Sequence, residues 1–293
     1  MTALLLCVAL AALQGKDLLI ATERLASIEN ALVLDVRPAD AFSSGHIPGA
    51  ANLDIGSLSE TRDGVAGLLK PLEQVHAALA AAGVDPAKHI VAYCGMEKPD
   101  DFKDAARMFW ILEYVGYPQV SVLDGGLAKW KAEGRSLEQG PTSVKPAVIP
   151  DLKPREDLLA TMEDVESAIK QGDKRLVDWR NADMYHGSKK ADIVKAPGHI
   201  PTAMNLSSEE MVRGQDSTLK QAGTIEELAK TQGVDLNAPT ITYCNSGRSA
   251  STGYFVLRML GNKQVSLYDG SMAEWTASEK NKVECDAPVA KEK

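Results

Sequence analysis

The chain has 293 residues, of which 44% are hydrophobic and 25% charged, and its formal net charge at pH 7 is −8. This length favours about two domains of ordinary size, and the composition is typical of a globular protein in water. The negative charge argues against general nucleic-acid binding, which requires a basic face. A small anionic substrate remains compatible with it, because a local cluster of arginines can outweigh a diffuse negative charge.

The chain starts with an apolar run from Ala3 to Leu13. Its length is typical of the apolar core of a signal peptide and is far too short to cross a bilayer, so no stable membrane insertion is expected. No Lys or Arg precedes the run, although signal peptides carry basic residues there. The preferred interpretation is a residual export signal over residues 1–16 and a periplasmic or exported protein. The alternative is an ordinary apolar segment of a cytoplasmic protein.

The cysteines are too few and too scattered for a disulfide framework, since there are only Cys7, Cys94, Cys244 and Cys285. No spacing of Cys and His that is typical of a metal site occurs. We therefore expect no structural disulfide and no metal site, and no cofactor is implied.

Four sequence blocks occur twice in the chain, in the same order. They are an Asp-x-Arg strand pattern at 32–37 and 175–180, a Gly-His-Ile-Pro turn at 45–50 and 198–203, a strand pattern that ends on a cysteine at 90–94 and 240–244, and an Asp-Gly element that runs to a tryptophan at 120–130 and 265–275. Four blocks in one order indicate a duplicated domain.

Each copy alternates short apolar runs with helical patterns, which we place at Leu72–Ala82, Ala105–Tyr114, Met162–Lys170 and Ile225–Gln232. This alternation predicts an α/β fold in which each domain is a parallel β-sheet with helices on both faces. Ligands of such folds bind at the carboxyl ends of the strands. The proline-rich stretch after residue 137 predicts a linker. We place the first domain at 17–137, the linker at 138–157, and the second domain with its polar C-terminal tail at 158–293.

The strand pattern Ile241–Tyr243 ends on Cys244, and a small polar loop then runs into a helical pattern. A cysteine at this junction lies among the unpaired backbone N–H groups of a helix start, where an anion is favoured. These surroundings favour the thiolate, which is the nucleophilic form of the side chain. The alternative from the local pattern is an inert, half-buried structural cysteine.

Taken together, the repeated blocks resemble the rhodanese (sulfurtransferase) superfamily in its tandem two-domain form, over about residues 18–278. The resemblance implies that a cysteine accepts a sulfane sulfur from a small anionic donor such as thiosulfate. It then passes the sulfur from a persulfide to a thiophilic acceptor, which is cyanide, a thiol or a thioredoxin-like protein. The resemblance also implies that the second domain carries the working cysteine and that the first is inactive. A 3-mercaptopyruvate sulfurtransferase is the alternative activity.

Cys244 matches the family nucleophile, which would attack the outer sulfur of thiosulfate and expel sulfite. The backbone N–H groups that follow are expected to cradle the anionic persulfide, and they belong to Asn245, Ser246, Gly247 and Ser249. Gly247 suits a loop conformation that most side chains disfavour. Arg248 is expected to contact the sulfonate of the donor.

Arg180 matches a family arginine near the pocket, and a structural ion pair with a carboxylate of its own domain is the alternative. Asp178 is expected to orient its neighbours rather than to donate a proton. Tyr185 and the lysine pair 189–190 either rim the entrance or lie on a solvated face. His46 and His199 recur in both halves, which favours structural turn histidines over general bases.

The loops after the two cysteines differ. Cys94 is followed by residues 95–101, where Pro99 lacks a backbone donor and three carboxylates disfavour a thiolate. Cys94 is therefore interpreted as a relic, with a redox or resolving role as the alternative. The loop after Cys244 matches neither the thiosulfate-type nor the mercaptopyruvate-type pattern of the family, and Met184 stands where a second pocket arginine is expected. Arg248 favours thiosulfate as the donor.

Two other functions compete with sulfur transfer. Cysteine phosphatases and arsenate reductases need an arginine six residues after the cysteine, but Ala250 stands there and Arg248 comes two positions early. The loop is thus sized for sulfur rather than phosphate. A non-catalytic binding or sulfur-relay module is the other alternative. The cradle is kept after Cys244 and lost after Cys94, which argues instead for one active site.

Overall fold

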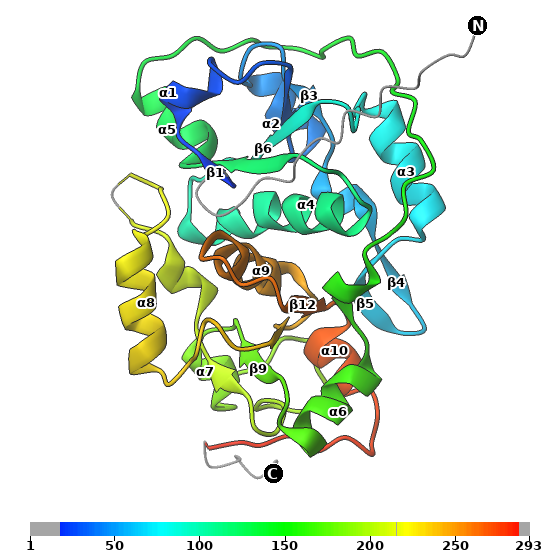
Figure 1. Cartoon of the computed structure of the whole chain (residues 1–293), viewed down its shortest axis with the longest axis vertical. Coiled ribbons are helices and arrows are strands. Elements are labelled where there is room, and N and C mark those ends of the chain that lie inside the picture. Colours follow the sequence, from blue (N-terminus) through cyan, green and yellow to red (C-terminus); the bar gives the residue numbers. More distant parts are fainter. Residues whose placement is uncertain (1–17, 215, 287–293) are drawn as a thin grey trace, which may run out of the picture.

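The computed structural model describes residues 18–214 and 216–286. The export signal that we predict at residues 1–16 lies outside these ranges and stays a prediction. The described chain forms two α/β domains, the first in the upper half of Figure 1 and the second in the lower half. In this part of the chain, no helix has the length and apolar character needed to cross a membrane.

The first domain is built on a five-stranded parallel sheet in the order β1-β7-β6-β2-β3. Its strands are β1 (Leu19–Ile20), β2 (Ala31–Asp35), β3 (Ala51–Asn52), β6 (His89–Tyr93) and β7 (Val120–Leu123). Its helices are α1 (Thr22–Leu25), α2 (Ala39–Ser44), α3 (Leu72–Ala81), α4 (Phe102–Tyr114) and α5 (Gly126–Ala132). An antiparallel hairpin of β4 (Ser59–Arg62) and β5 (Val65–Leu69) extends from this body and reaches helix α10 (Ser271–Trp275) of the second domain (Figure 1).

The second domain repeats the same sheet in the order β10-β9-β11-β12-β8, again with all strands parallel. Its strands are β8 (Leu159–Ala160), β9 (Arg175–Asp178), β10 (Met204–Asn205), β11 (Thr240–Tyr243) and β12 (Val265–Tyr268). Its helices are α6 (Met162–Gln171), α7 (Ala182–Tyr185), α8 (Ala222–Thr231), α9 (Arg248–Met259) and α10 (Ser271–Trp275). The predicted duplication is confirmed, and the four predicted helices occur as α3, α4, α6 and α8.

The two domains meet where α4 packs against α9. The ring of Phe255 makes edge contacts with Phe109 at 4.9 Å and with Phe102 at 5.4 Å between ring centroids. All three side chains are almost fully buried in a hydrophobic core that continues from one domain into the other. Each buried ring contributes roughly 1.5–3 kcal/mol through area removed from water. Helix α9 of the second domain is therefore packed against a fixed neighbour from the first domain.

The segment between α5 and the short 3-10 helix Glu156–Leu158 contains no helix or strand. It is nevertheless tied to the first domain, because Ala147 donates its N–H to the carbonyl of Ala80 at 2.8 Å. Arg155 donates its N–H to the carbonyl of Tyr114 at 2.7 Å. These bonds satisfy carbonyls at the ends of α3 and α4, so the segment also caps two helices.

Candidate active site

Cys244 lies directly after the fully buried strand β11, which pairs with β9 on one side and β12 on the other. Its side chain is almost completely buried. The chain then turns through Asn245 and Ser246 and enters α9, whose N-cap residue is Gly247 with a φ of 79°. This left-handed conformation is one that glycine adopts at little cost. The predicted placement of a cysteine at the junction of a strand and a helix is confirmed.

The loop offers free hydrogen-bond donors. Within the described chain, the backbone N–H groups of Asn245, Ser246, Arg248 and Ser249 have no hydrogen-bond acceptor, while that of Gly247 is bound. Such successive donors at a helix start form a concave binding site for an anion. The residues that we predicted for the cradle are thus brought together around Cys244.

The side chain of Ser271 forms hydrogen bonds to this loop. Its hydroxyl accepts the N–H groups of Cys244 and Gly247, both at 3.1 Å, and donates to the carbonyl of Tyr268 at 2.8 Å. The next two residues donate their N–H groups to the carbonyls of Cys244 and Asn245, both at 3.0 Å. Sequence reasoning missed Ser271. The available signal was the change from Gly126 in the first Asp-Gly element to serine in the second.

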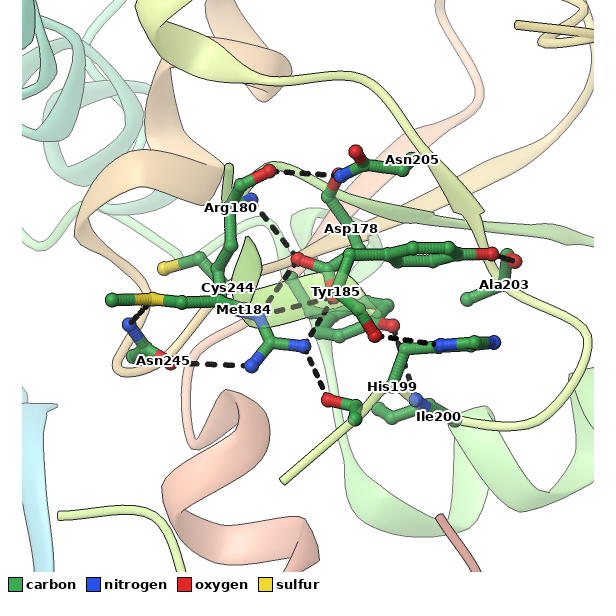
Figure 2. A network of polar contacts seen from close by, with 12 residues as sticks. Asp178, Arg180, Met184, Tyr185, His199, Ile200, Ala203, Asn205, Cys244 and Asn245 are labelled. Atoms are coloured by element: carbon green, nitrogen blue, oxygen red, sulfur yellow. Dashed lines mark hydrogen bonds and ion pairs between the residues drawn. The ribbon is translucent and has the colours of Figure 1, made fainter. Parts of the chain in front are cut away.

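Arg180 is buried and forms a two-pronged ion pair with Asp178, with N–O distances of 3.0 and 2.5 Å (Figure 2). It also donates to the carbonyl of Gly198 at 2.7 Å. Only Nη1 faces the cysteine loop, 3.5 Å from the side-chain oxygen of Asn245. Burial by itself lowers the pKa of Arg180, but the charge of Asp178 and, more weakly, those of Tyr243 and Cys244 raise it overall.

The first domain contains the same pair, because Arg37 binds Asp35 at 2.6 Å and the carbonyl of Gly45 at 2.8 Å. The structural ion pair that we gave as the alternative for Arg180 is therefore present. A contact between Arg180 and a substrate stays a prediction, and Nη1 is the atom available for it.

Arg248 is not a free cation. It forms an ion pair with Asp104, which lies on α4 of the first domain, and both side chains are partly exposed. A substrate anion would have to compete with this carboxylate or share the guanidinium with it. The predicted contact with the donor stays a prediction, and Asp104 is a residue that sequence reasoning missed.

Met184 lies at the edge of the loop. The side-chain amide of Asn245 donates to the Met184 sulfur at 3.3 Å, and Figure 2 shows both side chains beside Cys244. Ser246 is covered by the β4–β5 hairpin, because a Cβ added to Gly67 would come within 2.7 Å of the Ser246 Cβ. Part of the cover over the loop thus comes from the first domain.

Cys94 lies in a different environment. Its thiol is buried, and this burial together with the carboxylates of Asp104 and Asp101 raises its pKa well above the usual range. The residue equivalent to Ser271 is Gly126, which has no hydroxyl to offer. These features support the prediction that Cys94 is a relic.

His199 is held as expected of a turn histidine. Its backbone pairs with Glu284, its ring stacks on Tyr185 at 3.8 Å, and its Nδ1 lies 2.9 Å from the Tyr185 carbonyl (Figure 2). His46 makes the equivalent contacts with Glu138 and Phe42 in the first domain. The hydroxyl of Tyr185 donates to the Ala203 carbonyl at 2.6 Å, so this ring also supports the turn.

The two lysines considered for the entrance rim, Lys189 and Lys190, contact residues of their own domain. Lys189 pairs with Asp183 at 2.7 Å on an exposed surface, and Lys190 donates to the carbonyl of Val194 at 3.1 Å. Both contacts suit a solvated face better than a binding site.

The Rhodanese-like domain family matches the chain twice, over residues 21–133 and 161–278, and the chain belongs to this family. A putative thiosulfate sulfurtransferase from Saccharopolyspora erythraea is 31% identical over 242 residues, which are 80% of this chain and 83% of that protein. The 3-mercaptopyruvate sulfurtransferase of Escherichia coli is 29% identical over 83% of this chain and 84% of that protein. The protein is thus a transferase of the thiosulfate or 3-mercaptopyruvate sulfurtransferase type.

Two solved structures support the fold. The crystal structure of the 3-mercaptopyruvate sulfurtransferase SseA from Escherichia coli matches 87% of this chain and 98% of that chain, with a TM-score of 0.77 and 27% identity. An anaerobic ergothioneine biosynthesis enzyme from Chlorobium limicola matches 93% of this chain and 71% of that chain, with a TM-score of 0.81 and 24% identity. At this identity the second match shows the fold alone.

Proposed function

We propose that this sulfurtransferase moves a sulfane sulfur from thiosulfate to a thiophilic acceptor through a persulfide on Cys244. The observation that carries the proposal is the ring of unpartnered backbone N–H groups around this cysteine. Preorganised donors of this kind stabilise an anion in a site from which water is largely excluded. The persulfide is such an anion, and it fits a loop too short for a phosphate.

The reaction needs two displacements on sulfur. The Cys244 thiolate attacks the outer sulfur of thiosulfate, the S–S bond of the donor breaks, and sulfite leaves with the electron pair. Cyanide or a thiolate then attacks the outer sulfur of the persulfide. This second step releases thiocyanate or a new persulfide and returns Cys244 as a thiolate, so no external oxidant or reductant is consumed.

The choice of donor follows from the charges that face the loop. Arg180 presents one guanidinium nitrogen to it, whereas Arg248 shares its charge with Asp104. Met184 stands where the family resemblance implies a second pocket arginine. It presents a thioether to the loop, which cannot bind the carboxylate of mercaptopyruvate as an arginine would. One small anion with its charge close to the reacting sulfur suits this arrangement better than mercaptopyruvate, whose carboxylate lies further from the sulfur.

Intact-mass measurement after addition of thiosulfate tests the proposal. We expect a gain of one sulfur atom, about 32 Da, which cyanide removes, as covalent catalysis requires. The Cys244→Ala variant should lose this adduct and the matched Cys94→Ala variant should keep it. No adduct with thiosulfate or with mercaptopyruvate would overturn the transferase mechanism. An adduct with mercaptopyruvate alone would overturn the donor assignment.

The acceptor is proposed to be cyanide or a thiol, including the thiol of a thioredoxin-like protein. A reduced thioredoxin should discharge the Cys244 persulfide, which intact mass would register as the loss of about one sulfur atom. Discharge by small thiols but not by thioredoxin would restrict the acceptor to small molecules.

A further inference from the structure

A charged side chain of the first domain is buried against the active loop of the second. Arg107 lies on α4 and is completely buried. Its Nη2 is 2.6 Å from Oδ1 of Asp269, and its guanidinium lies over the Trp110 ring at 4.5 Å. In the described part of the chain none of its three guanidinium nitrogens, nor Oδ1 of Asp269, makes a hydrogen bond, so the contact between them is an ion pair alone. A buried guanidinium is costly to desolvate, so its presence calls for a reason.

The guanidinium touches the loop that carries Cys244. A Cβ added to Gly247 would lie 2.9 Å from Nη1 of Arg107 and 2.6 Å from Oδ1 of Asp269. The ion pair therefore fills the space that a side chain at this position would occupy. Asp269 is also two residues before Ser271, whose hydroxyl binds the N–H groups of Cys244 and Gly247. One ion pair thus contacts the loop and also supports the segment that holds it.

The duplication provides an internal comparison. Asp124 is the counterpart of Asp269, and each carboxylate accepts a backbone N–H from the other domain. Asp269 accepts that of Leu69 at 2.7 Å, and Asp124 accepts that of Leu219 at 2.9 Å. The residue of α9 equivalent to Arg107 is the buried Thr252, which has no charge to offer. The fully buried guanidinium is therefore present beside the Cys244 loop, whereas the cations near Asp124 are the partly exposed Lys129 and the exposed Arg213.

Asp124 makes the same kind of interdomain hydrogen bond without a buried arginine, so joining the domains does not by itself require one. We infer that Arg107 is a positioning residue of the Cys244 site, supplied by the first domain. It pairs with Asp269 and packs against Gly247. This contact keeps the segment with Ser271 in place, so that the loop N–H groups have the geometry that binds the persulfide. This inference rests on the proposed function and gives the first domain a role that does not require Cys94.

The test compares Arg107→Met and Arg107→Lys with a matched control at the same interface. The control is Arg258→Met, because Arg258 on α9 pairs with Glu113 on α4 at 2.8 Å and takes no part in the cysteine loop. Steady-state turnover with thiosulfate and cyanide, the rate of Cys244 alkylation by iodoacetamide at pH 8, and the melting temperature are measured for each variant.

We expect Arg107→Met to lower kcat by about 30-fold with KM changed by less than about threefold, because the loop is misplaced while donor contacts remain. Alkylation of Cys244 should slow by about tenfold, because the loop N–H groups no longer surround the reacting sulfur. Arg107→Lys should recover part of both rates, because an ammonium can still pair with the Asp269 carboxylate. Arg258→Met should melt earlier but keep both rates within about twofold of the parent.

Rates within about threefold of the parent in folded Arg107→Met would overturn the inference. So would a loss in Arg258→Met as large as that in Arg107→Met, because interface stability alone would then explain the effect. If Arg107→Met fails to fold, Arg107→Lys and Arg107→Gln take its place. Parental rates in both of these variants would refute the role. Alkylation needs no sulfur donor, so failure of the proposed function leaves this readout intact.

Discussion

Replacement of Ser271 by alanine should damage both the stability and the chemistry of the second domain. The hydroxyl is fully buried and makes three hydrogen bonds, two as acceptor from the N–H groups of Cys244 and Gly247 and one as donor to Tyr268. Alanine has nearly the same shape but leaves all three backbone groups without this partner. The change therefore tests the hydrogen bonds of the loop rather than its packing.

The expected loss can be worked out from these contacts. A buried polar group left without a partner costs roughly 1–3 kcal/mol, and a loop that relaxes recovers some of it, so Ser271→Ala should lose about 2–4 kcal/mol of unfolding free energy. Ser271 also has a φ of 49°, a left-handed conformation that costs a non-glycine residue about 1 kcal/mol. Ser271→Gly should thus lose the same bonds but be about 1 kcal/mol more stable than Ser271→Ala.

Urea denaturation gives the free energies, and mass spectrometry after rapid mixing with thiosulfate gives the rate of persulfide formation. We expect a rate about 10- to 100-fold lower in both variants, because displaced N–H donors no longer meet the sulfur. The reasoning would be refuted if Ser271→Ala lost less than about 0.5 kcal/mol and kept the parental rate. A stability order with glycine below alanine would refute the account of the backbone strain.

Three further predictions concern other parts of the molecule. Iodoacetamide at pH 9 should leave Cys94 unmodified in the folded protein, because burial and neighbouring carboxylates raise its pKa; modification as fast as that of the working cysteine would contradict this. Gly247→Ala should lose at least about 2 kcal/mol and the persulfide adduct, because its φ of 79° is strained for alanine and its Cβ would lie 2.6 Å from a carboxylate oxygen. Gly261→Ala is the control, with a φ of 95° and no atom within 4 Å, and should show only the smaller strain cost. The hydrogen bond from Lys129 lowers the pKa of Glu133 from 4.5 to about 2, so Glu133 stabilises the fold above pH 4.5 and this contribution disappears as the pH falls towards 2. The difference in unfolding free energy between the parent and Glu133→Gln should therefore shrink over that range, and a constant difference would refute the assignment.

Much of the fold could be predicted because its signals are local or repeated. Alternation of apolar runs with helical periods located the helices and the strand before Cys244, and the duplicated blocks indicated two domains of one kind. The cradle residues were also accessible, since they follow the cysteine directly. Periodicity needs only neighbours in the chain, and these neighbours decide strand and helix formation for strongly patterned segments.

The cross-domain contacts were not accessible in this way. Arg248 was assigned to the donor from its place in the loop, yet it pairs with Asp104, which is 144 residues away. Arg107 gives no sequence signal of its role, because a single arginine within an apolar helical pattern is typical of an exposed side chain. Its burial becomes apparent only when α4 is packed against the second domain. Such contacts depend on how two finished domains dock, and no local pattern encodes that geometry.

Ser271 lies between local signals and cross-domain contacts, because the duplication gives a hint of its role. Comparison with the first domain explains why loss of its hydroxyl should affect the Cys244 loop. Gly126 has nearly the same φ, 48°, and a Cβ there would lie 2.4 Å from the carbonyl oxygen of Cys94. The loop after Cys94 therefore has no room for a side chain at position 126. A different hydrogen bond stabilises it. The N–H of Lys98 is bound by the carboxylate of Asp101 at 3.0 Å, within the longer segment that follows Cys94. The short loop after Cys244 has no such carboxylate of its own. The hydroxyl of Ser271 binds the N–H of Gly247 instead, and its removal leaves the thiol in place while the donors that would hold its persulfide lose this support.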